Sequence, residues 1–152
     1  MAKQMIKGLT MLLLVVALSL VTAVVSANGQ SSSKRQIANI PFTFVVGDNE
    51  LSAGKYSVEP ATSAGDALKI TGTQNGTAMF RMSSQLDSLK PAERGKLVFH
   101  RYGNQYFLAE VWTAGERQGR KVTKSKGEKA IEREYTAIRS RSERVEIALG
   151  RQ

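Results

Sequence analysis

The stretch that decides the fold runs from Lys96 to Trp112 and reads KLVFHRYGNQYFLAEVW. Two runs rich in β-branched and aromatic residues flank Gly103 and Asn104, and both of these residue types tolerate the positive φ of a tight hairpin turn. The stretch therefore predicts a β-hairpin whose turn lies at these two residues.

The turn also predicts which residues share a face of the hairpin. A two-residue turn pairs Tyr102 with Gln105, and the regular alternation then pairs Leu97 with Glu110. One face carries Leu97, Phe99, Leu108 and Trp112, and the other carries Val98, His100, Tyr102, Phe107, Ala109 and Val111. A hairpin that is apolar on both faces needs cover on both sides, so we expect it near the centre of a β-fold. The pattern indicates an architecture and specifies no reaction.

Composition limits the chemistry of the chain. Its 152 residues give room for one domain with a core. The absence of cysteine excludes disulfides, thiolate catalysis, iron–sulfur clusters, thiolate zinc sites and a lipid-modified N-terminal cysteine. His100 is the single histidine, so one subunit cannot build a multi-histidine metal site. The glycines are scattered at predicted turns and form no phosphate-binding loop. We therefore expect no metal and no cofactor.

The N-terminal segment, residues 1–27, predicts a secretory signal peptide. Lys3 and Lys7 precede an apolar run from Leu9 to Val25, and small residues surround a cleavage position after Ala27. An uncleaved membrane anchor is the alternative, but the apolar run is slightly shorter than the roughly 18–20 residues that span a bilayer. We therefore expect export to the periplasm or the extracellular space.

The charge of the chain points to an anionic partner. The formal net charge is +9 and the pI is near 10, which is typical of proteins that bind nucleic acid, membrane headgroups or acidic polymers. Export removes nucleic acid from the list, because the protein does not meet it in that compartment. An anionic envelope polymer, a lipid surface or a partner protein remains.

The mature chain reads as a short leader followed by one domain. Residues 28–36 are small and polar, which is typical of disorder, and residues 37–150 form the predicted β-rich domain. Its first strand is expected over residues 37–46, with Pro41 at a sheet edge because proline cannot donate to a ladder. A second strand follows near Tyr56 and Val58.

A second hairpin is expected at Asn75-Gly76. A two-residue turn there would pair Ile70 with Arg81 and would leave Phe80 on the other face. One extra residue at Gly72 would bring Ile70 opposite Phe80, so the sequence predicts a β-bulge at residues 71–72.

The C-terminal part predicts a helix and a closing strand. Ser125 and Glu128 fit a capping box that opens a helix, and one face of this helix carries Ile131, Tyr135 and Ile138. Residues 143–149 then alternate apolar with polar side chains. The fold that we predict is a mainly antiparallel β-domain of about seven strands, a β-sandwich or a small barrel, with one C-terminal helix.

Three blocks of the chain carry a resemblance to a family of short exported bacterial proteins of unknown function. The blocks are Pro41–Gly47, Leu51–Val58 and Leu97–Trp112. Members of that family commonly have Leu-Pro-Ala-Gly where this chain has Leu51-Ser52-Ala53-Gly54, a difference that affects the stiffness of the turn. The resemblance implies export and a β-rich fold, and it implies no activity.

No catalytic constellation is visible in the sequence. His100 has no serine or acid at a spacing that demands partnership with it, so we expect a packed structural histidine. Glu110 is expected to lie near Arg101. The aromatic residues Tyr102, Tyr106, Phe107 and Trp112 could form a stacking platform for a sugar, although their alternation fits hairpin packing.

The basic segment is the candidate binding site. Five cations stand there against one acid, Glu116, and they are Arg117, Arg120, Lys121, Lys124 and Lys126. Such a segment is either a solvated loop or an anion-binding surface. The leading hypothesis is a non-enzymatic envelope or extracellular binding or structural module. The alternatives are an envelope-directed hydrolase that uses His100 with an unidentified acid, and a signal-anchored inner-membrane protein.

Overall fold

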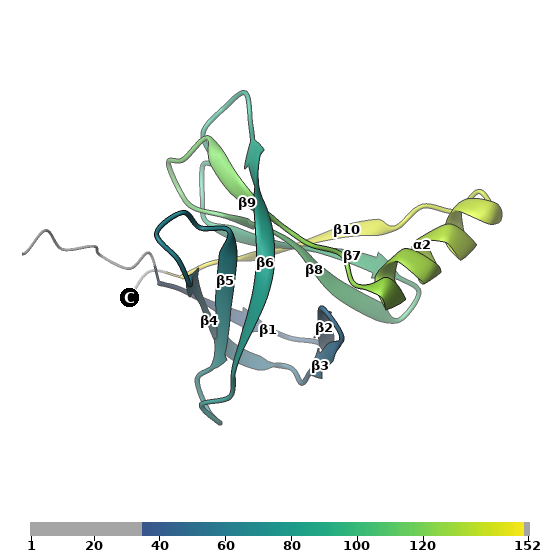
Figure 1. Cartoon of the computed structure of the whole chain (residues 1–152), viewed down its shortest axis with the longest axis horizontal. Helices are drawn as coiled ribbons and strands as arrows, with labels where there is room; N and C mark the ends of the chain where they lie inside the picture. The colour runs from purple at the N-terminus through teal and green to yellow at the C-terminus, as the bar shows by residue number, and fades with distance from the viewer. Residues whose placement is uncertain (1–34, 151–152) are drawn as a thin grey trace, which may run out of the picture. The chain divides into compact units, whose positions relative to one another are not determined.

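The computed structural model describes residues 35–150, which contain ten strands and one helix (Figure 1). The elements in chain order are β1 (Gln36–Ile40), β2 (Phe44–Val46), β3 (Asn49–Leu51), β4 (Gly54–Pro60), β5 (Ala67–Gly72), β6 (Ala78–Asp87), β7 (Lys96–Tyr102), β8 (Gln105–Trp112), β9 (Gln118–Val122), α2 (Lys126–Ala137) and β10 (Glu143–Ala148). The expectation of a mainly β-fold with one helix near the C-terminus is confirmed. The expectation of about seven strands is wrong for the described residues.

The strands form one mixed sheet. Its order is β1-β4-β5-β6-β9-β8-β2-β3, and β7 pairs with both β8 and β10. Every named pair is antiparallel except β2 with β8, which is parallel and joins Val45 to Phe107. The expectation of antiparallel pairing therefore holds for most of the sheet. β8 lies at its centre because it borders β7 on one side and both β9 and β2 on the other.

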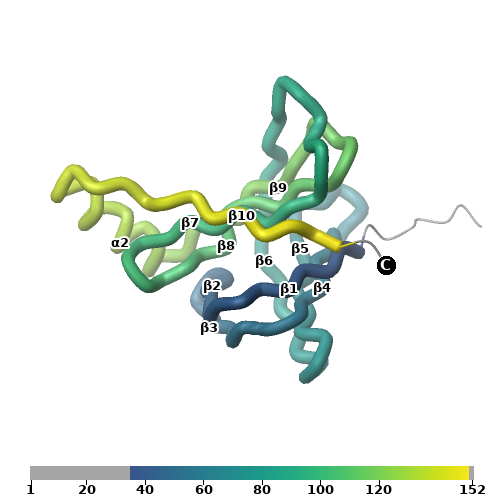
Figure 2. Tube along the Cα trace, turned by 180° about the vertical axis from the view of Figure 1, so that it is seen from behind, coloured from purple at the N-terminus to yellow at the C-terminus, as the bar shows by residue number. Residues whose placement is uncertain are grey.

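The two ends of the described chain meet at one place. The backbone N–H of Gly150 donates to the carbonyl of Ile37 at 2.8 Å, and this contact joins β1 to the residues that follow β10. Figure 2 shows the end of β10 reaching the start of β1.

The predicted first strand is divided between two positions in the sheet. β1 pairs with β4, whereas β2 pairs with β3 and β8. The break falls at residues 41–43 and begins with Pro41, which cannot donate a ladder hydrogen bond. β1 starts at Gln36, the last residue of the predicted leader. The predicted signal peptide, residues 1–27, and the leader as far as residue 34 lie outside the described residues.

The central hairpin follows its predicted register only near the turn. Tyr102 faces Gln105 as expected, but the pairing shifts between Val98 and Phe99, so that Leu97 faces Val111 instead of Glu110. One extra residue on β8 accounts for the shift, because such a bulge re-aims every side chain that follows it. Val111 therefore enters the core and Trp112 moves to the outer face, the reverse of the sequence expectation.

The prediction of a β-bulge at residues 71–72 in the second hairpin is wrong. The ladder between β5 and β6 is regular, and Ile70 faces Met79. A four-residue turn, residues 73–76, replaces the expected two-residue turn, with the N–H of Gly76 donating to the carbonyl of Gly72 at 2.9 Å. Phe80 therefore stays on the outer face and is 66% exposed.

One hydrophobic core joins the strands. It is built from Ala38, Ile40, Phe44, Val46, Tyr56, Val58, Leu68, Ile70, Leu97, Phe99, Leu108, Val111 and Val122. Its largest members interlock as aromatic pairs, since the Phe44 ring meets the rings of Tyr56 and Phe99 edge-on at centroid distances of 5.0 and 5.5 Å. These residues come from seven of the strands, and Val145 and Ile147 of β10 pack against them.

The helix begins as its capping signal predicts. Ser125 is buried and its hydroxyl accepts the backbone N–H of Glu128 at 3.1 Å. Tyr135 contacts the Tyr102 ring edge-on at 5.3 Å, which attaches α2 to β7. Ile138, expected on the same packed face, ends the helix and is 73% exposed, so that part of the expectation is wrong. No helix in residues 35–150 has the length and apolar character needed to cross a membrane.

Candidate functional site

The predicted basic segment is largely a strand. β9 covers residues 118–122, and its Gly119 and Val122 are buried. Arg117 donates from Nε to the carbonyl of Ser88 at 3.3 Å, and Arg120 donates from Nη2 to the carbonyl of Ala64 at 3.0 Å. These two guanidinium groups therefore hold loops in place, and the solvated loop that the sequence allowed is not what forms.

The other three predicted cations lie toward the helix. Lys124 is half-buried and forms a hydrogen-bonded ion pair with Glu132. This hydrogen bond lowers the pKa of Glu132 and outweighs the opposing effect of burial. Lys121 and Lys126 are exposed.

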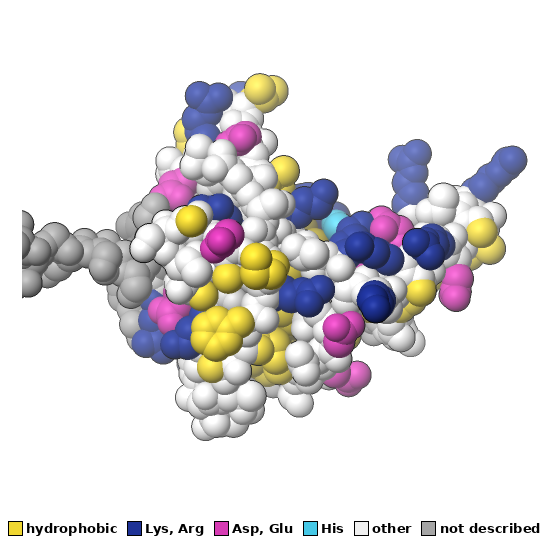
Figure 3. Space-filling view, in the orientation of Figure 1, with side chains coloured by type: hydrophobic (Ala, Val, Ile, Leu, Met, Phe, Trp, Pro, Cys, Tyr) yellow, Lys and Arg dark blue, Asp and Glu magenta, His cyan; other side chains and the backbone are white. Residues whose placement is uncertain are grey.

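The helix extends this positive charge. We define the cationic surface as Lys121, Lys124, Lys126, Lys129 and Arg133. The last two residues lie on α2 and are exposed, and Figure 3 shows Lys and Arg side chains gathered over the helix and the adjoining segment. The structure thus brings Lys121, Lys124 and Lys126 to one surface and directs Arg117 and Arg120 elsewhere.

His100 has an acidic partner that sequence reasoning did not find. Its Nδ1 lies 3.3 Å from Oε1 of Glu128, whose side chain is only 4% exposed. His100 is not among the residues that line three cavities formed by residues 35–150. The contact joins α2 to β7.

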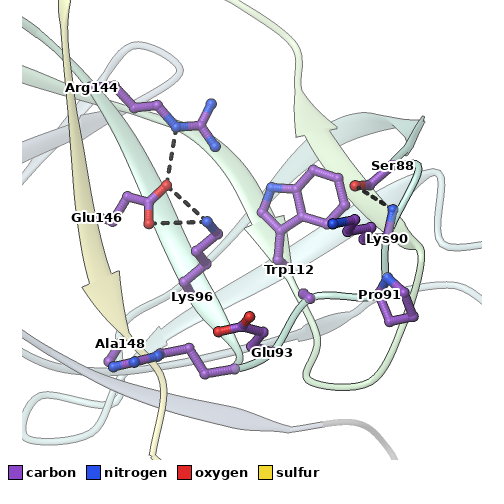
Figure 4. A pocket seen from close by; sticks show the side chains of 11 residues that line it. Ser88, Lys90, Pro91, Glu93, Lys96, Trp112, Arg144, Glu146 and Ala148 are labelled. Atoms are coloured by element: carbon purple, nitrogen blue, oxygen red, sulfur yellow. Dashed lines mark hydrogen bonds and ion pairs between the residues drawn. The ribbon is translucent and has the colours of Figure 1, made fainter.

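A groove lies on the outer face of the central strands, where the bulge has placed Trp112 (Figure 4). It has a volume of about 630 Å³. One wall is the loop after β6, the opposite wall is β10, and Lys96 and Trp112 lie between them. Its lining residues are Ser88, Lys90, Pro91, Ala92, Glu93, Arg94, Lys96, Trp112, Arg144, Glu146 and Ala148.

A chain of ion pairs runs along one side of this groove. Arg144 binds both carboxylate oxygens of Glu110, at 3.1 and 3.0 Å, and its Nε donates to Glu146 at 3.1 Å. Lys96 binds both oxygens of Glu146, at 2.8 and 3.0 Å. Trp112 completes the series by donating its indole N–H to Glu110 at 2.7 Å. We call these five residues the ionic ladder.

Sequence reasoning missed the ladder because it placed Glu110 near Arg101. Arg101 pairs instead with Glu143, at 3.1 Å. The signal that could have found the ladder is the alternation of Arg144 and Glu146 in β10, because that strand lies beside β7 and displays both residues on one face.

The four candidate aromatic residues do not form one platform. Tyr106 stacks on Phe42 with ring centroids 4.0 Å apart, and Tyr102 meets Phe107 edge-on at 5.8 Å. Both contacts are internal packing, as the alternation predicted. Trp112 is the member of this set that lines the groove.

No three acidic, histidine or cysteine side chains within residues 35–150 lie close enough together to hold a metal ion. Comparisons with protein-family models, with curated proteins and with solved structures found no match to this chain. The resemblance to short exported bacterial proteins therefore stays a prediction.

Proposed function

We propose that this chain is an exported, non-enzymatic module that binds an anionic envelope polymer or lipid surface through the cationic surface. The observation that carries the proposal is the separation of charge over β9 and α2. Residues 118–137 contain six cations and three acids. Glu128 is turned inward to His100 and Glu132 is occupied by Lys124, which leaves Glu134 as the acid of these residues that forms no ion pair with another described residue.

Such a surface attracts polyanions without a shaped pocket. Exposed cations that lie within one Debye length of each other, about 8–10 Å, add their potentials at physiological ionic strength. The attraction depends on salt, and it requires that the cations stay free of internal partners. Lys121, Lys126, Lys129 and Arg133 form no ion pair with another described residue.

The proposal includes export and a closed sheet. Export rests on the signal-peptide pattern in residues 1–27. The bridge between Ile37 and Gly150 supports closure of the strands into a small barrel, with β2 and β3 as a side extension of β8. A closed sheet has few free edges, which suits a protein that works outside the cytoplasm.

The second candidate is an envelope-directed hydrolase. The contact between His100 and Glu128 favours it, because an oriented histidine is the usual general base. The absence of His100 from the three cavities weighs against it. The third reading, a signal-anchored inner-membrane protein, depends on residues outside the described part of the chain.

Sedimentation with vesicles tests the leading proposal. The purified protein should sediment with phosphatidylglycerol vesicles or bind an acidic polysaccharide at low salt, and it should not bind phosphatidylcholine vesicles. Replacing Lys121, Lys126 and Lys129 by Gln should reduce binding by about tenfold or more, since each cation near an anionic surface contributes about 1 kcal/mol.

The matched control removes the same charge elsewhere. Arg35→Gln, Lys55→Gln and Lys69→Gln leave the cationic surface intact and should reduce binding only slightly. Equal losses in the two triple variants would show that net charge alone drives binding and would refute the proposed surface. Testing phosphatidylglycerol vesicles and the acidic polysaccharide separately shows whether the ligand is a lipid surface or a polymer.

A further inference from the structure

We propose that the groove beside Trp112 is a second binding site and that its ligand is a short carbohydrate carrying a carboxylate group. The proposal is independent of the cationic surface, because none of the five residues of that surface lines the groove.

The groove has the size of a small-molecule site. Its volume of about 630 Å³ lies within the range of about 300–1,000 Å³ that ligand pockets occupy. It is partly open to solvent, which suits a short piece of a longer polymer better than an enclosed metabolite.

The loop wall is held in place before any ligand arrives. The backbone N–H of Ser88 donates to the carbonyl of Arg117 at 2.8 Å, and that of Ala92 donates to Glu116 at 2.9 Å. In return, the N–H of Gly115 donates to the carbonyl of Ala92 at 2.8 Å. Three backbone hydrogen bonds thus fix the loop to the turn before β9. A preformed wall lowers the ordering cost of binding.

The floor of the groove includes a small exposed part of the Trp112 side chain. Trp112 is 7% exposed, and the part that remains exposed lines the groove. Its indole N–H is already bound to Glu110, so the ring presents apolar surface and no free donor. The C–H groups of a sugar ring suit such a surface.

The charges of the groove favour a ligand with one negative charge. Lys96, Arg144 and Glu146 are occupied within the ionic ladder. Lys90 and Arg94, both exposed on the loop wall, have side chains that form no hydrogen bond or ion pair with another described residue. These two cations are free to bind a carboxylate.

The acids of the groove distinguish a sugar acid from a phosphate. Glu93 and Glu146 line the same groove as Lys90 and Arg94. Their carboxylates accept hydrogen bonds from hydroxyl groups and repel additional negative charge. A ligand rich in hydroxyls with a single carboxylate satisfies both sets of groups. A multiply charged phosphate does not.

Tryptophan fluorescence tests the proposal directly, because Trp112 is the single tryptophan of the chain. The purified protein is titrated with trisaccharides that contain one uronic acid residue, with the corresponding neutral trisaccharides and with inorganic phosphate. We expect a saturable change in emission with a uronic acid trisaccharide. Lys90→Gln/Arg94→Gln should weaken that binding by about tenfold or more, since charged hydrogen bonds are lost.

Two controls keep the outcome interpretable. Lys121→Gln/Lys126→Gln/Lys129→Gln should leave the fluorescence response unchanged, even if it abolishes binding to vesicles, so that the two proposals fail separately. Lys55→Gln/Lys69→Gln controls for net charge. The inference is overturned if no uronic acid trisaccharide gives a saturable response. It is also overturned if neutral sugars or phosphate bind equally well, or if the Lys90/Arg94 variant binds like the parent.

Discussion

The contact between Gly119 and Trp112 gives a sharp test of how the groove floor is built. A Cβ atom added at Gly119 would lie 2.7 Å from Cδ2 and from Cε3 of the indole, and 2.9 Å from Cε2. Ordinary contacts begin near 3.4 Å, so the ring would have to move by about 0.7 Å. It cannot swing freely, because it is nearly buried and its N–H is held by Glu110.

Gly119→Ala should therefore destabilise the fold and disturb the groove together. Overpacking of this kind costs about 1–3 kcal/mol, and loss of a hydrogen bond to a charged group adds about 1.5–3 kcal/mol if the indole moves away. With both costs present, the free energy of unfolding should fall by about 2.5–6 kcal/mol. Urea unfolding followed by circular dichroism gives the energy, and the native Trp112 emission spectrum reports the displacement.

Gly127→Ala is the matched control. This residue lies in the first turn of α2, and its added Cβ would meet only the Ser125 hydroxyl, at an ordinary 3.7 Å. The substitution should be neutral or stabilising by up to about 1 kcal/mol, because alanine favours a helix over glycine. A Gly119→Ala protein as stable as the parent, with unchanged emission, would refute the described packing of Trp112.

Two further outcomes follow from the side-chain contacts. His100→Gln should cost only about 1 kcal/mol, since glutamine can still donate to Glu128, and should leave binding to vesicles unchanged; loss of all function in a folded variant would revive the hydrolase. The Lys96 hydrogen bond, with help from Arg144 and against burial, lowers the pKa of Glu146 from its ordinary value of 4.5. Because the folded protein then binds this proton less readily than the unfolded chain, the stabilisation is complete above pH 4.5 and fades as the pH falls through the lowered value. Urea unfolding of Glu146→Gln should show a flatter pH dependence in that range, and an unchanged profile would contradict the assignment.

Some features of the molecule could be predicted because they depend on neighbouring residues. The turn at Gly103-Asn104, the N-cap at Ser125 and the alternation in β10 each arise from local backbone preferences. The basic segment could be predicted only in part. Its charge is visible in the sequence, but whether each cation stays free depends on carbonyl groups such as that of Ala64, which lies 56 residues away from Arg120.

The sequence by itself determined a β-rich chain with one capped helix, a central apolar hairpin and a surplus of positive charge, since each of these follows from residue types at short spacing. Tertiary structure alone decided what lies on the outer face of that hairpin. The shift at Val98 turns Val111 inward and Trp112 outward, and the pairing of β10 with β7 brings Arg144 within hydrogen-bond distance of Glu110 on β8. The physical reason is that side chains alternate across a strand, so one extra residue reverses every later face. Arg144 and Glu110 are 34 positions apart in the sequence, and they meet because of the order of the strands. That order is a property of the whole sheet and not of any local stretch.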